Sequence, residues 1–143
     1  MPYLSMTRLK LKSPGYLPSF LVYNGQIVKE IRVSDGFLKG KQGVTLDLSM
    51  WTTTLWDSYT NLQKFYRSGS HRKVMSQIDV WSSEAVSGHR EVHSFDLPSW
   101  KSVGVLLAES GHFVNLEEPS LKHQQRIIQE SKFPPITIPI LPS

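Results

Sequence analysis

His71 is the residue whose type and position are best suited to chemistry in this chain of 143 residues. It stands at the start of a predicted helix, where the positive end of the helix dipole disfavours an imidazolium and favours the neutral ring. A neutral imidazole can accept a proton or ligate a haem iron. The alternative is a local role, in which His71 orders the turn Ser68-Gly69-Ser70.

Ser68 and His71 together suggest a nucleophile with its base. A hydrolase of this kind also needs a carboxylate that orients the histidine and an oxyanion hole, and no motif marks either one. The sequence also lacks a glycine-rich phosphate loop and a dinucleotide fingerprint. These observations argue against hydrolase and nucleotide-dependent chemistry.

His89 lies in a predicted strand, on the same face as Ala85 and Ser87, whose small side chains leave room beside it. It either lines a pocket or is a half-buried histidine with satisfied hydrogen bonds. His93 follows four residues later, but in a strand this spacing separates the two rings, and no carboxylate is arranged with them. The sequence therefore predicts no metal site.

Trp51 and Trp56 are five residues apart in the strongest strand signal of the chain, so they point to opposite faces. One is expected under the helices and the other toward a partner or a pocket mouth. Thr52 and Thr54 could present hydroxyl groups to a ligand, although β-branched residues are also simply good strand formers.

The elements that position these residues follow a recognisable order. Strands are predicted at 3–11, 37–41, 44–56 and 84–92, and helices from Leu17 to before Gly36, from Asp57 to Ser68, from His71 through Ile78, and from Pro98 to Ser110. Turns are expected near Gln42-Gly43 and at a left-handed Gly69. The order β-α-β-β-α-(α)-β is that of a ferredoxin-like α+β fold.

Residues 44–56 carry apolar or hydroxyl side chains on both alternating faces, apart from Asp47. An antiparallel strand covered by helices on one side normally shows a polar second face. The pattern therefore predicts that a second subunit covers the open face of the sheet.

The chain is expected to divide into a ferredoxin-like domain at 1–110 and a C-terminal extension at 111–143. Within the extension, residues 119–130 are predicted to be helical. The end of the chain, from Phe133, is apolar and punctuated by proline, so it cannot be a central strand. It is either disordered or laid in extended form along a neighbouring surface.

Composition narrows the class of protein. There is no cysteine, which excludes disulfides and thiolate chemistry.

No signal peptide and no apolar run of about 20 residues is visible, so a cytoplasmic protein without a membrane span is predicted. The net charge of +4 comes from dispersed basic residues, and the central strand lacks the signature of RNA-recognition motifs. Nucleic-acid binding is therefore not expected.

A family resemblance becomes visible between residues 50 and 75. Its pattern is Met50-Trp51-Thr52-x-Thr54-x-Trp56-Asp57, followed by Phe65-x-x-Ser68-Gly69-x-His71-x-x-x-Met75. The pattern resembles an uncharacterised bacterial family of monooxygenase-like domains, in the dimeric α+β barrel group that includes antibiotic-biosynthesis monooxygenases. The segment is also loosely similar to spheroidene monooxygenase, which uses haem. Arg90 departs from the pattern, because an aromatic residue is commoner there.

The resemblance implies a homodimer whose subunits each hold a small apolar molecule, or haem, in a pocket between sheet and helices. We predict that His71 is the axial ligand or general base, that Arg67 pairs with an anionic group, and that Ser68 belongs to the same catalytic site. The residues expected to bind the ligand are Trp56, Met75, His89 and Thr54. The alternative is a non-catalytic ligand-binding or assembly module with the same fold.

Overall fold

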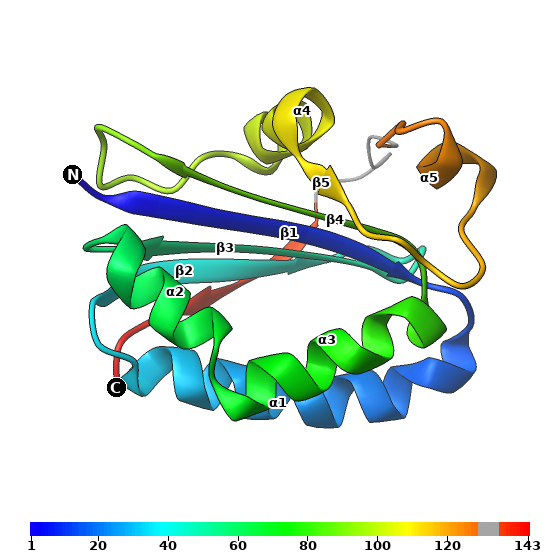
Figure 1. Ribbon diagram of the computed structural model, residues 1–143, viewed down its shortest axis with the longest axis horizontal. Coiled ribbons are helices and arrows are strands. Elements are labelled where there is room, and N and C mark those ends of the chain that lie inside the picture. The colour runs from blue at the N-terminus through cyan, green and yellow to red at the C-terminus, as the bar shows by residue number, and fades with distance from the viewer. Residues whose placement is uncertain (129–134) are drawn as a thin grey trace.

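A single antiparallel sheet of six strands forms the centre of the computed structural model, which describes residues 1–128 and 135–143. The strand order is β5-β4-β1-β3-β2-β6 (Figure 1). The four central strands, with α1, α2 and α3 packed on one face, form the ferredoxin-like arrangement, so the predicted fold class is confirmed.

The element bounds are as follows. The strands are β1 (Tyr3–Leu11), β2 (Phe37–Val44), β3 (Ser49–Trp56), β4 (Ser82–Glu91), β5 (His112–Phe113) and β6 (Ile136–Ile140). The helices are α1 (Leu17–Val33), α2 (Tyr59–Tyr66), α3 (Gly69–Trp81), α4 (Trp100–Ser110) and α5 (Leu121–Gln124), and a 3-10 turn at Pro14–Tyr16 precedes α1. No helix in the described ranges is long and apolar enough to cross a membrane.

The two faces of the sheet are covered by different helices (Figure 1). Residues of β1 alternate between them, because successive side chains of a strand point to opposite sides. Tyr3 packs on the side of α1–α3, which we call the α1 face. Leu4 and Met6 pack with Val103 and Leu107 of α4, on the side that we call the α4 face.

The covering of the α4 face differs from the expectation. A second subunit was predicted there, but α4 and α5 of the same chain lie on this face (Figure 1). Val103 and Leu107 are fully buried against it. The two-sided apolar pattern of β3 was therefore interpreted correctly as two covered faces, while the cover itself comes from residues far along the same chain. A homodimer stays a prediction.

The hairpin between β2 and β3 turns later than predicted. The turn lies at residues 45–48 and not at Gln42-Gly43, because hydrogen bonds from Ser49 N to Thr45 Oγ1 and Asp47 Oδ1 close it. Gly43 stays in β2, where a side chain would collide with Trp100, since a Cβ atom would lie 2.9 Å from its ring. Here the glycine marks a close approach in the strand.

Two glycines at helix boundaries, Gly36 and Gly69, differ in backbone conformation. Gly36 has a φ of 79°, and a Cβ atom there would lie 2.2 Å from Asp57 Oδ1, so only glycine fits after α1. Gly69, for which a left-handed conformation was predicted, does not have positive φ and is instead the first residue of α3. That part of the prediction is wrong, because the second helix follows α2 without a separate glycine stop.

The C-terminal extension joins the same sheet. The proline-punctuated end forms β6, an edge strand that pairs with β2, so the extended alternative is confirmed for residues 136–140. The predicted helix at 119–130 is reduced to α5, and its residues 129–130 lie outside the described ranges, as do Phe133 and its neighbour Pro134. The strand β5, which was not predicted, pairs with β4 at the opposite edge.

Candidate functional site

Five aromatic rings form a continuous cluster at one end of the α1 face. We call Tyr3, Tyr59, Tyr66, His71 and His89 the aromatic site. The His89 ring stacks on Tyr59 at 5.3 Å and lies 5.7 Å from Tyr3 and 6.5 Å from Tyr66. The ring of Tyr66 lies 5.1 Å from His71. His89 and Tyr59 are exposed, whereas the other three rings are half-buried, so the cluster runs from the surface inward.

Four elements, β1, β4, α2 and α3, bring these rings together. Ser5 of β1 lies opposite His89 of β4 in register, which places Tyr3 and His89 on the same face of neighbouring strands. Tyr59 and Tyr66 are seven residues apart in α2, two helical turns, and therefore share one side of the helix. Ser58 is the N-cap of this helix, because its hydroxyl accepts a hydrogen bond from Asn61 N.

Tyr66 is tied to the sheet by its hydroxyl group, which hydrogen-bonds with Ser5 Oγ. Burial raises the pKa of the Tyr66 phenol, and the hydrogen bond from Ser5 offsets this only in part. Tyr66 therefore stays neutral, and its ring lies near both histidines, 5.1 Å from His71 and 6.5 Å from His89.

His71 is held as a neutral base. Its Nδ1 lies 3.2 Å from the carbonyl oxygen of Tyr66, and because a carbonyl can only accept, Nδ1 carries the proton. Nε2 is then the basic nitrogen. Burial lowers the pKa of His71 below its ordinary 6.5, while the hydrogen bond to Tyr66 and the nearby charge of Glu30 raise it by less.

This pKa predicts how pH affects stability. Above about pH 6.5 the ring is neutral in both the folded and the unfolded chain, and below it the unfolded chain takes up the proton first. The free energy of unfolding of the wild type should therefore fall more between pH 7 and 5 than that of His71→Gln, measured by urea unfolding. His112→Gln, at an exposed position of β5, is the matched control and should follow the wild type. Equal pH dependence of all three proteins would contradict the assignment.

Trp56 and Thr54 lie beneath this cluster. Trp56 is 0% exposed, and its Nε1 donates to Thr54 Oγ1 at 2.9 Å. The Phe65 ring stacks on Trp56 at 5.4 Å and meets His71 edge-on at 5.2 Å. The Thr54 hydroxyl, predicted to face a ligand, is thus used inside the core, and Trp56 fills the layer between sheet and helices.

The remaining predicted residues are spread around α3. Arg67 is exposed at the end of α2, and Met75, one turn after His71 in α3, is 41% exposed. Ser68 precedes α3 but its hydroxyl does not cap the helix, and its Oγ is buried without a hydrogen-bond partner. Of the seven predicted residues, the structure links His71, His89, Trp56 and Thr54 through Phe65 and Tyr66.

Haem does not fit at His71 as the described residues are packed. Phe65 and Tyr66 lie against the imidazole, and behind them Trp56 and Leu62 are fully buried. On the side where these four side chains pack, there is no room for a haem beside the ring. The neutral imidazole is therefore better suited to accept a proton than to hold an iron.

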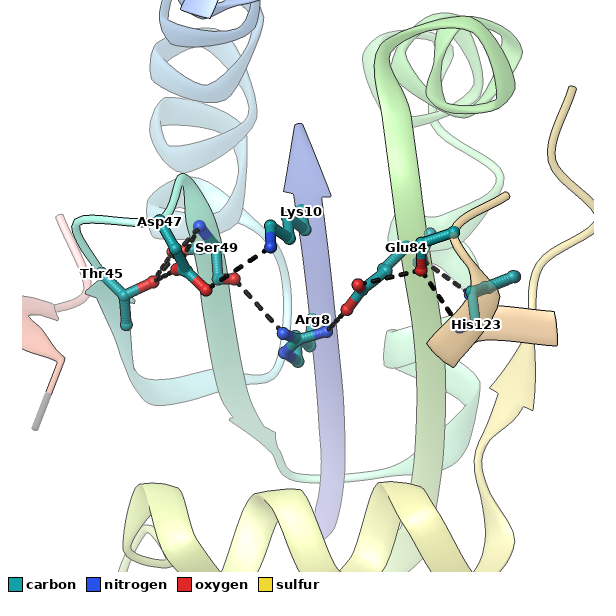
Figure 2. A network of polar contacts seen from close by, with 9 residues as sticks. Arg8, Lys10, Thr45, Asp47, Ser49, Glu84 and His123 are labelled. Carbon is teal, nitrogen blue, oxygen red and sulfur yellow. Dashed lines mark hydrogen bonds and ion pairs between the residues drawn. The ribbon is translucent and has the colours of Figure 1, made fainter. Parts of the chain in front are cut away.

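A second polar cluster lies on the α4 face, opposite the aromatic site (Figure 2). Arg8 Nη1 donates to Glu84 Oε1 at 2.7 Å, and Arg8 Nη2 lies 3.3 Å from Ser49 Oγ. Ser120 Oγ donates to the other carboxylate oxygen at 3.0 Å. Burial raises the pKa of Glu84, but the hydrogen bond and charge of Arg8 outweigh burial and hold it below its usual 4.5. Because its charged groups are paired with each other, this cluster stabilises the fold.

A shallow cleft of about 350 Å³ also opens on the α4 face. Leu4, Val92 and Leu106 contribute apolar walls, and Arg90 and His93 contribute polar groups. The cleft lies on the other side of the sheet from His71, so it is not the pocket expected between the sheet and α1–α3. Arg90, the residue that departs from the family pattern, belongs to this cleft.

Sequence reasoning missed Tyr3, Tyr59, Tyr66 and Ser5. The seven-residue spacing of Tyr59 and Tyr66 was an available signal, because it places both rings on one side of a helix. Their meeting with Tyr3 and His89 depends on strand register and could not be read from spacing within any one element.

Comparison with known proteins supports the fold. No protein-family model matches the sequence, and no curated protein matches it. Among solved structures, Rv0793 from Mycobacterium tuberculosis is 10% identical, with a TM-score of 0.59 over 66% of this chain and 97% of its own. An antibiotic biosynthesis monooxygenase is 9% identical, with a TM-score of 0.56 over 64% of this chain and 99% of its own.

A third solved structure is a variant of SnoaB, a cofactor-independent oxygenase from Streptomyces nogalater. It is 11% identical, with a TM-score of 0.55 over 68% of this chain and 98% of its own. At such identities the likeness concerns the fold alone. The chain has the fold of antibiotic-biosynthesis-monooxygenase-like proteins, and about a third of it lies outside each match.

Proposed function

We propose that this chain, which shares the fold of antibiotic biosynthesis monooxygenases, is a monooxygenase-like protein that binds a small flat apolar molecule at the aromatic site. The observation that carries the proposal is His71. It is half-buried and neutral, its Nδ1 is fixed on the Tyr66 carbonyl, and it belongs to a ring cluster that reaches the surface at Tyr59 and His89.

Stacking would provide the binding. The rings of Tyr59 and His89 are inclined by only 28°, and Tyr59 is 40% exposed, so both offer apolar surface to a flat ligand. An aromatic contact contributes about 0.5–1.5 kcal/mol beyond the area that it buries. Arg67, exposed at the end of α2, would attract an anionic group of the ligand.

Proton abstraction would be the chemical step of this chain. His71 Nε2 would accept a proton from an acidified CH2 group or a phenol, which leaves an electron-rich anion. Dioxygen would oxidise this anion: a CH2 group becomes a carbonyl, one oxygen atom enters the product and the other leaves as water. The substrate supplies the electrons, so the reaction needs no cofactor; SnoaB, which has the same fold, is a cofactor-independent oxygenase.

A non-catalytic binding module is the second candidate. The aromatic site opens to solvent at His89 and Tyr59, so bulk water reaches the place where an anion would form. An open site of this kind favours reversible stacking over a reaction that depends on excluding water.

The partner proposed from the sequence is a second copy of the chain. The aromatic site uses residues of one chain alone, so its chemistry does not require the dimer. A homodimer would need a surface other than the α4 face, because α4 occupies that face.

Anthrone, a flat ketone with an acidic CH2 group, tests the proposal. We expect saturable quenching of protein fluorescence and oxygen uptake by the wild type. His71→Gln should lower the rate of uptake about 100-fold or more, because a general base contributes about 10²–10⁴-fold. Tyr59→Ala should raise the Kd about 2- to 10-fold, the equivalent of one aromatic contact.

Matched controls separate the outcomes. His112→Gln and Phe95→Ala change an exposed histidine and an exposed aromatic ring that make no ring contact with the five residues of the aromatic site, and both should behave as the wild type. Saturable binding without oxygen uptake would identify the binding module. Absence of saturable binding in the wild type would contradict both candidates.

A further inference from the structure

The α4 face is buried by residues of the same chain. Leu4, Met6, Trp51, Leu55 and Val86 of the sheet are at most 4% exposed. The side chains that cover them include Val103 and Leu107 of α4 and, at the margin, Trp100, Phe113 and Ile128, all from the C-terminal arm, which we define as residues 92–143. These residues of the sheet are therefore already covered and are not available to a second subunit.

Polar contacts show that the arm is matched to this face in detail. The Glu84 carboxylate uses one oxygen for Arg8 (Figure 2). Its other oxygen accepts a hydrogen bond from Ser120 of the arm. His123 of α5 accepts a hydrogen bond from Ala85 N at Nδ1, and its Nε2 donates to Val114 O at 2.8 Å. Two buried polar groups of β4, the Glu84 carboxylate and the Ala85 N–H, therefore have partners in the arm.

The arm also occupies both edges of the sheet. β5 pairs with β4 at one edge and β6 pairs with β2 at the other. Beyond β6, Ser143 N donates to Arg32 O and Arg32 Nε donates to Leu141 O, so the chain end is tied to α1. Pro139 removes an N–H group from the new edge strand, which discourages further strand pairing.

We infer that the C-terminal arm is a built-in partner: it occupies, within one chain, the sheet face that the apolar pattern of residues 44–56 assigns to a second subunit. The alignments with three solved structures of this fold cover 97–99% of their chains but only 64–68% of this one. The part of this chain that lies outside each match is nearly as long as the arm.

Tethering explains why the arm prevails over a second copy. Only residues 92–99 separate β4 from α4. A short linker holds its ends at an effective concentration on the order of millimolar, well above that of a free second chain at micromolar protein. Docking of α4 in the same chain is therefore favoured even when a second chain offers the same contacts.

Disulfide trapping tests this inference, because the chain contains no cysteine of its own. A Cβ atom on Gly88 would lie 3.3 Å from Leu107 Cδ2 and would meet no closer atom. The double variant Gly88→Cys/Leu107→Cys is therefore expected to form a disulfide within one chain on mild oxidation. The expected product is a 16.3 kDa chain that migrates as a monomer on a non-reducing gel and has no free thiol.

The control pair is Gly25→Cys/Gly88→Cys. Gly25 is exposed on α1, on the other side of the sheet, so this pair should keep both thiols free. A disulfide between two chains in the Gly88/Leu107 variant would show that the arm is exchanged between subunits and would overturn the inference. Free thiols in that variant would overturn it as well.

The wild type provides a measurement that needs no substitution. Hydrogen exchange of the amides of β1 and β3 should be independent of protein concentration between about 1 and 100 µM if the cover belongs to the same chain. Protection that rises with concentration would mean that a second subunit supplies the cover, and the inference would be wrong even if the double variant failed to fold.

Discussion

Replacing Arg8 by methionine is expected to lower the free energy of unfolding by about 3–5 kcal/mol, the usual effect of removing one partner of a buried ion pair. Glu84 is 5% exposed and would remain as a carboxylate whose main partner is gone. Solvent cannot replace the guanidinium, because the side chains of Arg8 and Glu84 are only 3% and 7% exposed. Urea unfolding of the wild type and the variant at pH 7 measures the difference.

An exposed ion pair of the same length is the matched control. Lys64 Nζ lies 2.7 Å from Asp35 Oδ2, as close as Arg8 to Glu84, but both side chains are more than 70% exposed. Lys64→Met should therefore change stability by no more than about 1 kcal/mol. Equal losses in Arg8→Met and Lys64→Met would contradict the buried assignment. The double variant Arg8→Met/Glu84→Leu should recover much of the loss, because it removes the unpaired charge.

The pH dependence should change in the same variant. In the wild type the folded-state pKa of Glu84 lies below its usual 4.5, so its stabilising contribution is complete above that pH and is lost as pH falls through the folded-state value. Without Arg8, burial still raises the pKa of the carboxylate, and only the smaller effects of Ser120 and Lys10 lower it. Arg8→Met should therefore lose less stability than the wild type on acidification.

Trp56→Ala is expected to lower the free energy of unfolding by about 3–5 kcal/mol, because it removes a large fully buried ring and leaves a cavity. Trp56 is 0% exposed between Phe37 and Phe65, at ring distances of 5.5 and 5.4 Å. The substitution also removes the hydrogen bond that Trp56 Nε1 donates to the Thr54 hydroxyl. Thermal or urea unfolding measures the loss.

Binding of indole is the second part of this experiment. It has the shape of the missing side chain and should raise the stability of Trp56→Ala in proportion to the occupancy of the cavity, but not that of the wild type. Phe95→Ala, at a 62% exposed position, is the control and should change stability by about 0.5 kcal/mol or less. If Trp56→Ala were as stable as the wild type, Trp56 would be a pocket wall and not core.

Local patterns in the sequence were sufficient for most elements. The apolar spacing after Leu17 predicts α1, Ser58 caps α2, and Gly36 ends α1 because no other residue fits its φ. The turn at residues 45–48 was misplaced, because glycine at position 43 serves close packing against Trp100 and not chain reversal. The sequence alone does not distinguish a glycine that allows close packing from one that allows chain reversal.

The candidate site was only partly predictable. His71 and His89 stood out by residue type, and the likeness in pattern pointed to the segment around Ser68. Tyr3, Tyr59 and Tyr66 were missed, because their contacts with the histidines arise from the register of β1 with β4 and the placement of α2 against the sheet. Trp56 and Thr54 were expected at a ligand and are buried together in the core.

The sequence by itself determined the ferredoxin-like order of strands and helices and the fact that both faces of residues 44–56 are covered, since alternation and periodicity are local properties of a chain. Only the tertiary structure decided what covers the second face. A second subunit and a distant segment of the same chain bury the same residues and leave the same pattern in β3. The contacts of Leu107 with the sheet and of Ser120 with Glu84 assign that cover to the chain itself.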